Sequence, residues 1–272
     1  RSTLIEFLKD KLFTNNFRFG KEVRKVSKIK NKLLINFTDN TNDLVDFIIV
    51  SDGVFSKTKS TVENRIIKPR HDGSVAIRTV IRFSEEFNYE SKNISLIMLP
   101  NAHVVIYPIN KKNDFNLVCI AREKLSQNYD THSIIKKKIL SKNKNLENLF
   151  KGDLNLWPVY VTKKPTKSIH DNVFYLGDAF YTFVPALAQG ASQSIEAAYE
   201  LFNLLSESKK NIQNIYFKKR LKRVNEINKR SKFNYFGFHI SNPTLKTLRN
   251  FFLKRLVKNK NFIQSYLGKI YK

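Results

Sequence analysis

Residues 172–205, NVFYLGDAFYTFVPALAQGASQSIEAAYELFNLL, constrain the fold more than any other stretch of the chain. An apolar strand ends at Gly177 and Asp178, and an amphipathic helix is expected over about residues 189–206. Ligands of open α/β sheets bind outside the carboxyl ends of the strands. A glycine there lets a ligand approach the backbone, and a carboxylate accepts hydrogen bonds from hydroxyl groups. Free N–H groups where the helix begins, around Gly190, can stabilise negative charge. The alternative is a strand, a turn and a packing helix without a ligand.

The remaining sequence predicts strands first and helices last. Residues 22–31 and 32–38 alternate as a hairpin does, and residues 43–53 read as one nearly continuous apolar strand, covered on both faces and ending at Asp52 and Gly53. Four further strands follow, forming an antiparallel or mixed sheet. We therefore expect an α/β protein with a core from residues 1–65 and 162–210, an inserted sheet from residues 66–161 and C-terminal helices from residues 211–272.

Composition excludes several classes of protein. The single cysteine, Cys119, rules out a disulfide framework and favours a reduced, cytoplasmic setting, with the thiol as a core residue. The histidines lack metal-ligand spacing, so we expect no metal site. No apolar run is long enough for a transmembrane helix. The net charge of +26 admits a nucleic-acid partner, but no binding motif accompanies it, so none is expected.

Five stretches, in order along the chain, resemble motifs of the FAD-dependent aromatic hydroxylases. LGDAFYTFVPALAQGASQSIEAA at 176–198 is similar to their second FAD-binding motif, and its Pro-x-x-x-Gln-Gly-Ala form looks like the salicylate hydroxylase and 3-hydroxybenzoate 6-hydroxylase branch. IIVSDGVFSKTKS at 48–60 resembles their Asp-Gly motif, with Ser56 in place. The other matches are Arg1 with Leu4, the strand pair at 103–121, and Tyr216 with Arg220 and Arg223.

The resemblance implies a Rossmann-like FAD-binding domain of the para-hydroxybenzoate hydroxylase type, with the inserted sheet as substrate domain. It implies FAD as cofactor, NADH or NADPH as electron donor, and O2 and a small aromatic compound as substrates. Asp178 would bind the ribityl chain, Arg1 would lie along the cofactor, and Asp52 with Gly53 would brace the pyrophosphate side. Gly177 would lie beside the cofactor, and the loop with Pro185, Gly190 and Ala191 would lie against the flavin ring. The implied substrate contacts are Gln189, Tyr107 and His103.

The sequence also departs from the family. The G-x-G-x-x-G motif is absent, so we expect an N-terminally truncated FAD domain whose 272 residues bind FAD weakly or not at all. Phe180 and Tyr181 replace the family's Ala-His, and Ala197 replaces an aspartate. Two alternatives stay open: a related flavoprotein, such as a ubiquinone-pathway hydroxylase or a prenyl reductase, and a non-catalytic basic binding protein on a degenerate flavin fold. A homodimer is possible.

Overall fold

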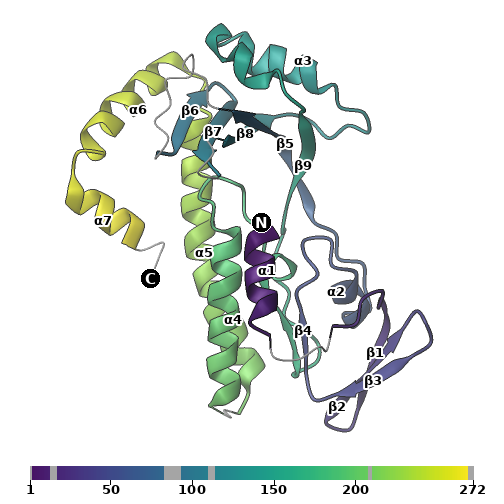
Figure 1. Ribbon diagram of the computed structural model, residues 1–272. Coiled ribbons are helices and arrows are strands. Elements are labelled where there is room, and N and C mark those ends of the chain that lie inside the picture. Colours follow the sequence, from purple (N-terminus) through teal and green to yellow (C-terminus); the bar gives the residue numbers. More distant parts are fainter. Residues whose placement is uncertain (1, 13–16, 83–92, 110–113, 208–209, 269–272) are drawn as a thin grey trace.

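The computed structural model describes residues 2–12, 17–82, 93–109, 114–207 and 210–268. Their strands form three sheets, with helices beside them (Figure 1). The strands are β1 Val23–Ile29, β2 Lys32–Phe37, β3 Asn42–Val45, β4 Ile48–Val50, β5 Arg70–Arg82, β6 Ser95–Leu99, β7 Ala102–Pro108, β8 Asp114–Arg122, β9 Asn155–Val161 and β10 Val173–Tyr175. The helices are α1 Ser2–Asp10, α2 Lys57–Val62, α3 Thr131–Ile135, α4 Gly190–Ser206, α5 Ile212–Phe238, α6 Pro243–Leu256 and α7 Lys260–Gly268, with short helical turns η1 Lys136–Leu140, η2 Lys144–Phe150 and η3 Gly177–Ala179.

The first sheet is an antiparallel meander in the order β1-β2-β3. β1 and β2 form the predicted hairpin, in which Val26 lies opposite Ile35. Leu33 and Val26 are buried because alternate side chains of a strand point to the same face.

The prediction of one continuous strand over residues 43–53 is wrong. The segment divides into β3, which pairs antiparallel with β2, and β4, which pairs parallel with β10. The chain passes from the first sheet to the second between these strands. There the carbonyl of Asp46 accepts a hydrogen bond of 2.8 Å from Asn172 Nδ2, next to β10. Within the described residues β4 is covered on one face only, because Ile49 is 44% exposed. A run of apolar residues in a sequence does not indicate which neighbouring strand each part of it pairs with.

The five-stranded sheet has the order β6-β7-β8-β5-β9, and all of its strand pairs are antiparallel. One face packs against α3, η1 and η2 around Val75, Ile77 and Leu117. Cys119 is fully buried in this core, as expected, and burial raises the pKa of its thiol to about 12. The other face, near Ala76 and Ile120, packs against the segment before α4 and the end of α5.

The predicted C-terminal helices are confirmed, and α5 runs through the middle of the molecule (Figure 1). Its buried residues follow a spacing of three or four, from Tyr216 through Val224 and Ile227 to Tyr235. α4 packs against α5 through Leu201 and Leu204. None of the helices in the described ranges combines the length and the hydropathy that crossing a bilayer would require.

Candidate functional site: the carboxyl ends of β4 and β10

Two acidic residues follow neighbouring parallel strands. Asp52 and Gly53 come after β4, and Gly177 and Asp178 come after β10. The strands are in register with Val50 opposite Tyr175, and one more bond of 2.9 Å joins the Leu176 N–H to the Val50 carbonyl. Both carboxylates therefore belong to one edge of the sheet, where parallel α/β proteins bind ligands.

Gly177 brings this edge against the first turns of α4. Its φ is +59°, which favours glycine, and a Cβ atom there would lie 2.8 Å from Ser194 Oγ. Gly177 and Gly190 line the same small crevice with Gln193 and Ser194. The strand end and the start of the helix thus converge, as the local sequence pattern implies.

The start of α4 offers unpaired donors. Because the helix begins at Gly190, the first N–H groups of that turn have no partner within the helix. Gln189 is 4% exposed; its Oε1 accepts a hydrogen bond of 3.3 Å from Gln193, while its Nε2 has no partner among the described residues. Pro185, Gly190 and Ala191 are exposed. This set of donors is suited to a bound group that carries negative charge or acceptor atoms.

Lys59 on α2 fixes the two strand ends relative to each other, a role that sequence reasoning missed. Its Nζ donates a hydrogen bond of 2.6 Å to the Ala179 carbonyl, and burial lowers its pKa although Asp52 and Glu63 oppose the shift. Ser56 caps α2 by accepting from the Lys59 N–H at 2.9 Å. Asp52 accepts from the Thr58 N–H at 3.2 Å. The lysine lies 120 residues from its acceptor, so no local pattern could have indicated the contact.

A buried polar network holds α4 on α5. Arg220 is 2% exposed and donates to Glu196 at 2.8 Å and to the Gln193 side chain at 2.9 Å. Arg223 donates to both oxygens of Glu196, at 2.8 and 3.0 Å. Burial tends to raise the pKa of Glu196, but the bonds from Arg223 and Arg220 outweigh burial and lower it. The Tyr-x-x-x-Arg-x-x-Arg pattern therefore serves to position α4.

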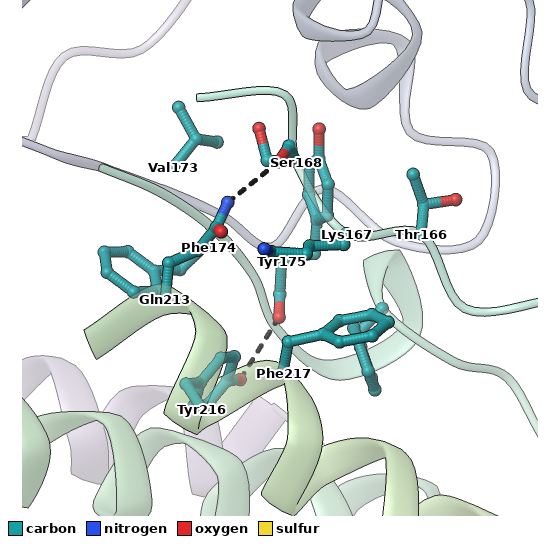
Figure 2. A pocket seen from close by; sticks show the side chains of 10 residues that line it. Thr166, Lys167, Ser168, Val173, Phe174, Tyr175, Gln213, Tyr216 and Phe217 are labelled. Atoms are coloured by element: carbon teal, nitrogen blue, oxygen red, sulfur yellow. Dashed lines mark hydrogen bonds between the residues drawn. The ribbon is translucent and has the colours of Figure 1, made fainter. Parts of the chain in front are cut away.

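The first residue of that pattern, Tyr216, positions β10. Figure 2 shows its hydroxyl directed at the backbone of Tyr175, to whose carbonyl it donates at 3.1 Å. Gln213, one turn earlier on α5, donates to the Ser168 carbonyl at 2.9 Å (Figure 2) and to the His170 carbonyl at 2.7 Å. These bonds attach β10, which leads into Asp178, and the segment before it to the longest helix of the described chain.

Phe180 and Tyr181 lie at the base of the crevice that Gly177 and Gly190 line, but little of either side chain is accessible. They are 4% and 8% exposed and belong to the core between the first two sheets. Phe180 contacts the rings of Tyr216 and Phe217, and burial raises the pKa of Tyr181. The substitution of the family's Ala-His thus adds apolar packing beneath η3.

Two of the remaining sequence candidates lie on β7 of the five-stranded sheet, and one of them, His103, lies beside the Pro185 backbone. Tyr107 on β7 is half-buried and its hydroxyl accepts from Asn116 Nδ2 at 2.7 Å. His103, on the same strand and face, is 1% exposed, with its Nδ1 2.7 Å from His239 Nε2. The burial of His103 and its contact with His239 indicate that it packs within the protein. Arg1 lies outside the described residues. Within the described ranges no group of three or more His, Cys, Asp or Glu side chains could hold a metal ion.

Known proteins provide a comparison. No protein-family model matches the sequence. The salicylate hydroxylase of Pseudomonas putida is 22% identical over 241 residues, which cover 79% of this chain and 56% of that protein. The 3-amino-4-hydroxybenzoate 2-monooxygenase of Streptomyces cremeus is 23% identical over 255 residues, covering 88% and 62%. The crystal structure of HpxO from Klebsiella pneumoniae with FAD and uric acid superposes with a TM-score of 0.84 at 16% identity, covering 99% of this chain and 71% of that one.

The chain thus spans 56% and 62% of the lengths of these two curated relatives. The resemblance inferred from the sequence motifs and the α/β fold that it implies are both confirmed.

Proposed function

Because the chain has the fold of the FAD-dependent aromatic hydroxylases, we propose that it forms the ribityl- and ring-facing part of an FAD-dependent monooxygenase that hydroxylates a small aromatic compound. The observation that carries the proposal is the convergence of Asp178 and the start of α4. A Cβ atom at Gly177 would lie 2.8 Å from Ser194 Oγ of α4, and Gly177 and Gly190 line one crevice.

The residues at this edge suit the cofactor. Asp178 is exposed at the end of β10, where it would accept hydrogen bonds from ribityl hydroxyls. Asp52 and Gly53, after the paired strand β4, would lie on the pyrophosphate side. Gly53 has φ +88° and its surroundings leave space for a ligand, since a Cβ atom there would meet nothing within 4 Å.

The chemistry follows from the cofactor and from the polarity of the site. Bound FAD would pass two electrons from NADH or NADPH to O2, so that one oxygen atom enters the aromatic ring and the other is reduced to water. The N–H groups at the start of α4 would stabilise negative charge on the ring system, and the buried Nε2 of Gln189 would add a donor. Tyr107 is the proposed substrate contact on the sheet. A phenol or hydroxybenzoate-like compound is the proposed substrate class, since the relatives' names specify hydroxybenzoates.

Uncovered apolar surface supports the proposal that a dinucleotide-binding βαβ unit completes the site. Over the described residues the β4–β10 sheet has two strands, fewer than a stable independent sheet needs. Ile49 on β4 is 44% exposed, and Ile195, Tyr199 and Phe202 form an exposed stripe on α4, each at least 59% exposed. We propose that polypeptide outside residues 1–272 covers this surface and supplies the adenosine pocket.

The test is to express the whole open reading frame that encodes these residues. We expect a yellow protein with bound FAD that oxidises NADH or NADPH when a hydroxybenzoate is present and incorporates one atom of 18O2 into the product. Asp178→Ala should reduce FAD affinity at least about tenfold, because a charge-assisted hydrogen bond contributes roughly 1.5–3 kcal/mol. Asp153→Ala, at an exposed residue before β9, is the matched control. A colourless protein without flavin would refute the proposal.

The other readings have their own discriminating measurements. A ubiquinone-pathway hydroxylase or prenyl reductase would prefer prenylated rings over small phenols in a substrate panel. A basic binding protein would bind heparin or DNA with an affinity that falls steeply with salt. A cytoplasmic location and a homodimer stay predictions.

A further inference from the structure

The C-terminal helix α6 has no buried residue, although its sequence, PTLKTLRNFFLKRL, is rich in large apolar side chains. Its ends are well formed: Asn242 caps it by accepting from the Leu245 N–H at 3.1 Å, and Pro243 occupies the first turn. Leu245, Leu248 and Phe252 recur on one face and are each about half exposed. A stable helix with this pattern requires an apolar surface for that face.

That face opens onto a groove of about 420 Å3 between α6 and the end of α5. The groove is lined chiefly by apolar side chains, among them Met98, Phe233, Phe236, Leu245, Leu248 and Phe252. Phe233 and Phe236, on the α5 side, are 69% and 61% exposed, so the groove is open to solvent along its length. α6 and α7 extend along one side of α5 (Figure 1), and α7 is attached to α5 by a bond of 2.9 Å from Arg230 to the Tyr266 carbonyl.

The surroundings of the groove are uniformly basic. Residues 243–268 contain six lysines and arginines and no acidic residue. Lys246, Lys254, Arg255 and Lys258 are exposed, and Arg255 lies 4.4 Å from the centre of the Phe251 ring. A helix with leucine and phenylalanine on one face and lysine and arginine around it has the composition of helices that lie in a membrane interface.

We propose that α6 and the adjoining groove bind the surface of an anionic phospholipid bilayer. The apolar face enters the boundary between headgroups and acyl chains, and the basic residues contact the headgroup phosphates. A nucleic acid would use the same charges, but the leucines and the methionine of the groove have no counterpart on a phosphate backbone. The proposal does not depend on the flavin chemistry.

The test is flotation of the 272-residue protein with vesicles of phosphatidylcholine alone and of phosphatidylcholine mixed with phosphatidylserine. We expect binding to the mixed vesicles and little binding to phosphatidylcholine. Leu248→Asp combined with Phe252→Asp should weaken binding at least about tenfold, since it removes inserted apolar side chains. The fold should be retained because α6 has no buried residue, and circular dichroism checks this. Phe19→Asp, at a residue that is 85% exposed on another surface, should bind as the parent does.

Charge reversal provides the second arm. Lys254→Glu with Arg255→Glu should weaken binding to the mixed vesicles at least roughly 30-fold, since about 1 kcal/mol is lost for each basic residue removed from an anionic surface and the new carboxylates are repelled by it. Lys142→Glu with Lys144→Glu, at exposed residues just before η2 and at its start, should have a much smaller effect. Absence of vesicle binding would overturn the proposal. The proposal would also be overturned if both charge-reversal pairs weakened vesicle binding equally and the Leu248→Asp and Phe252→Asp variant bound as the parent does. Tighter binding to single-stranded DNA than to vesicles, abolished by the α6 variants, would overturn it as well.

Discussion

At the scale of residues, the buried pair of His103 and His239 links the five-stranded sheet to α5. His103 and His239 are 1% and 6% exposed, and their rings are joined by a contact of 2.7 Å between Nδ1 and Nε2. Burial lowers the pKa of His103 to about 4. Burial, the charge of His103 and that of Arg122 lower the pKa of His239 to about 3. Both imidazole rings are therefore uncharged near neutral pH, and in this form they join β7 to the end of α5.

This pair should make the protein sensitive to mild acid. The unfolded histidines titrate near pH 6.5, so below that pH the unfolded state binds more protons than the folded state, and stability falls as pH falls from about 6.5 towards 4. Between pH 7 and pH 5 we expect the free energy of unfolding to decrease by about 2–4 kcal/mol, measured by urea denaturation. His132→Gln, at an exposed histidine, should leave this decrease unchanged. Stability that is flat over this range would contradict the assignment.

At the scale of elements, the position of α4 depends on Arg220. The guanidinium is almost fully buried between α4 and α5 and bonds to Glu196 and Gln193. Removing one partner of a buried ion pair leaves the other without its compensating charge.

We therefore expect Arg220→Ala to lower the free energy of unfolding by about 3–5 kcal/mol, measured by chemical denaturation. Lys219→Ala, next to it on α5 but 56% exposed and 4.0 Å from Glu200, should change it by less than about 1 kcal/mol. Equal effects of the two substitutions would show that the network does not hold the helices together.

Elements with a local signature could be predicted from the sequence, and contacts between distant residues could not. The strand, the turn at Gly177 and the helix from Gly190 are adjacent in the chain, so their pattern predicts both their existence and the edge they form. The division between β3 and β4 arises because β3 pairs with β2 and β4 pairs with β10. The apolar pattern of the segment does not identify these partners. The bond from Lys59 to Ala179 and the pairing of His103 with His239 were missed because each spans more than 100 residues.

At the scale of the whole molecule, the described chain leaves one apolar face of α4 uncovered. Ile195, Tyr199 and Phe202 occupy successive turns of α4 on the face opposite Leu201 and are 59%, 68% and 64% exposed. Contiguous apolar surface of this kind marks an interaction site or leads to self-association. The same face supports the proposal that a further βαβ unit packs there.

Tyr199→Lys combined with Phe202→Lys should accordingly reduce self-association of the 272-residue chain, measured by sedimentation velocity, and leave the melting temperature unchanged within about 2 °C, because neither side chain is buried. Phe19→Lys with Ile66→Lys adds the same charge at residues that are 85% and 80% exposed elsewhere, and should leave self-association unchanged. If the proposed βαβ unit packs on this face in a longer protein, the α4 variant should there destabilise the fold and weaken FAD binding, since two charges would be buried against that unit. A longer protein that tolerates the α4 variant with its flavin retained would show that this face is not where the cofactor domain is completed.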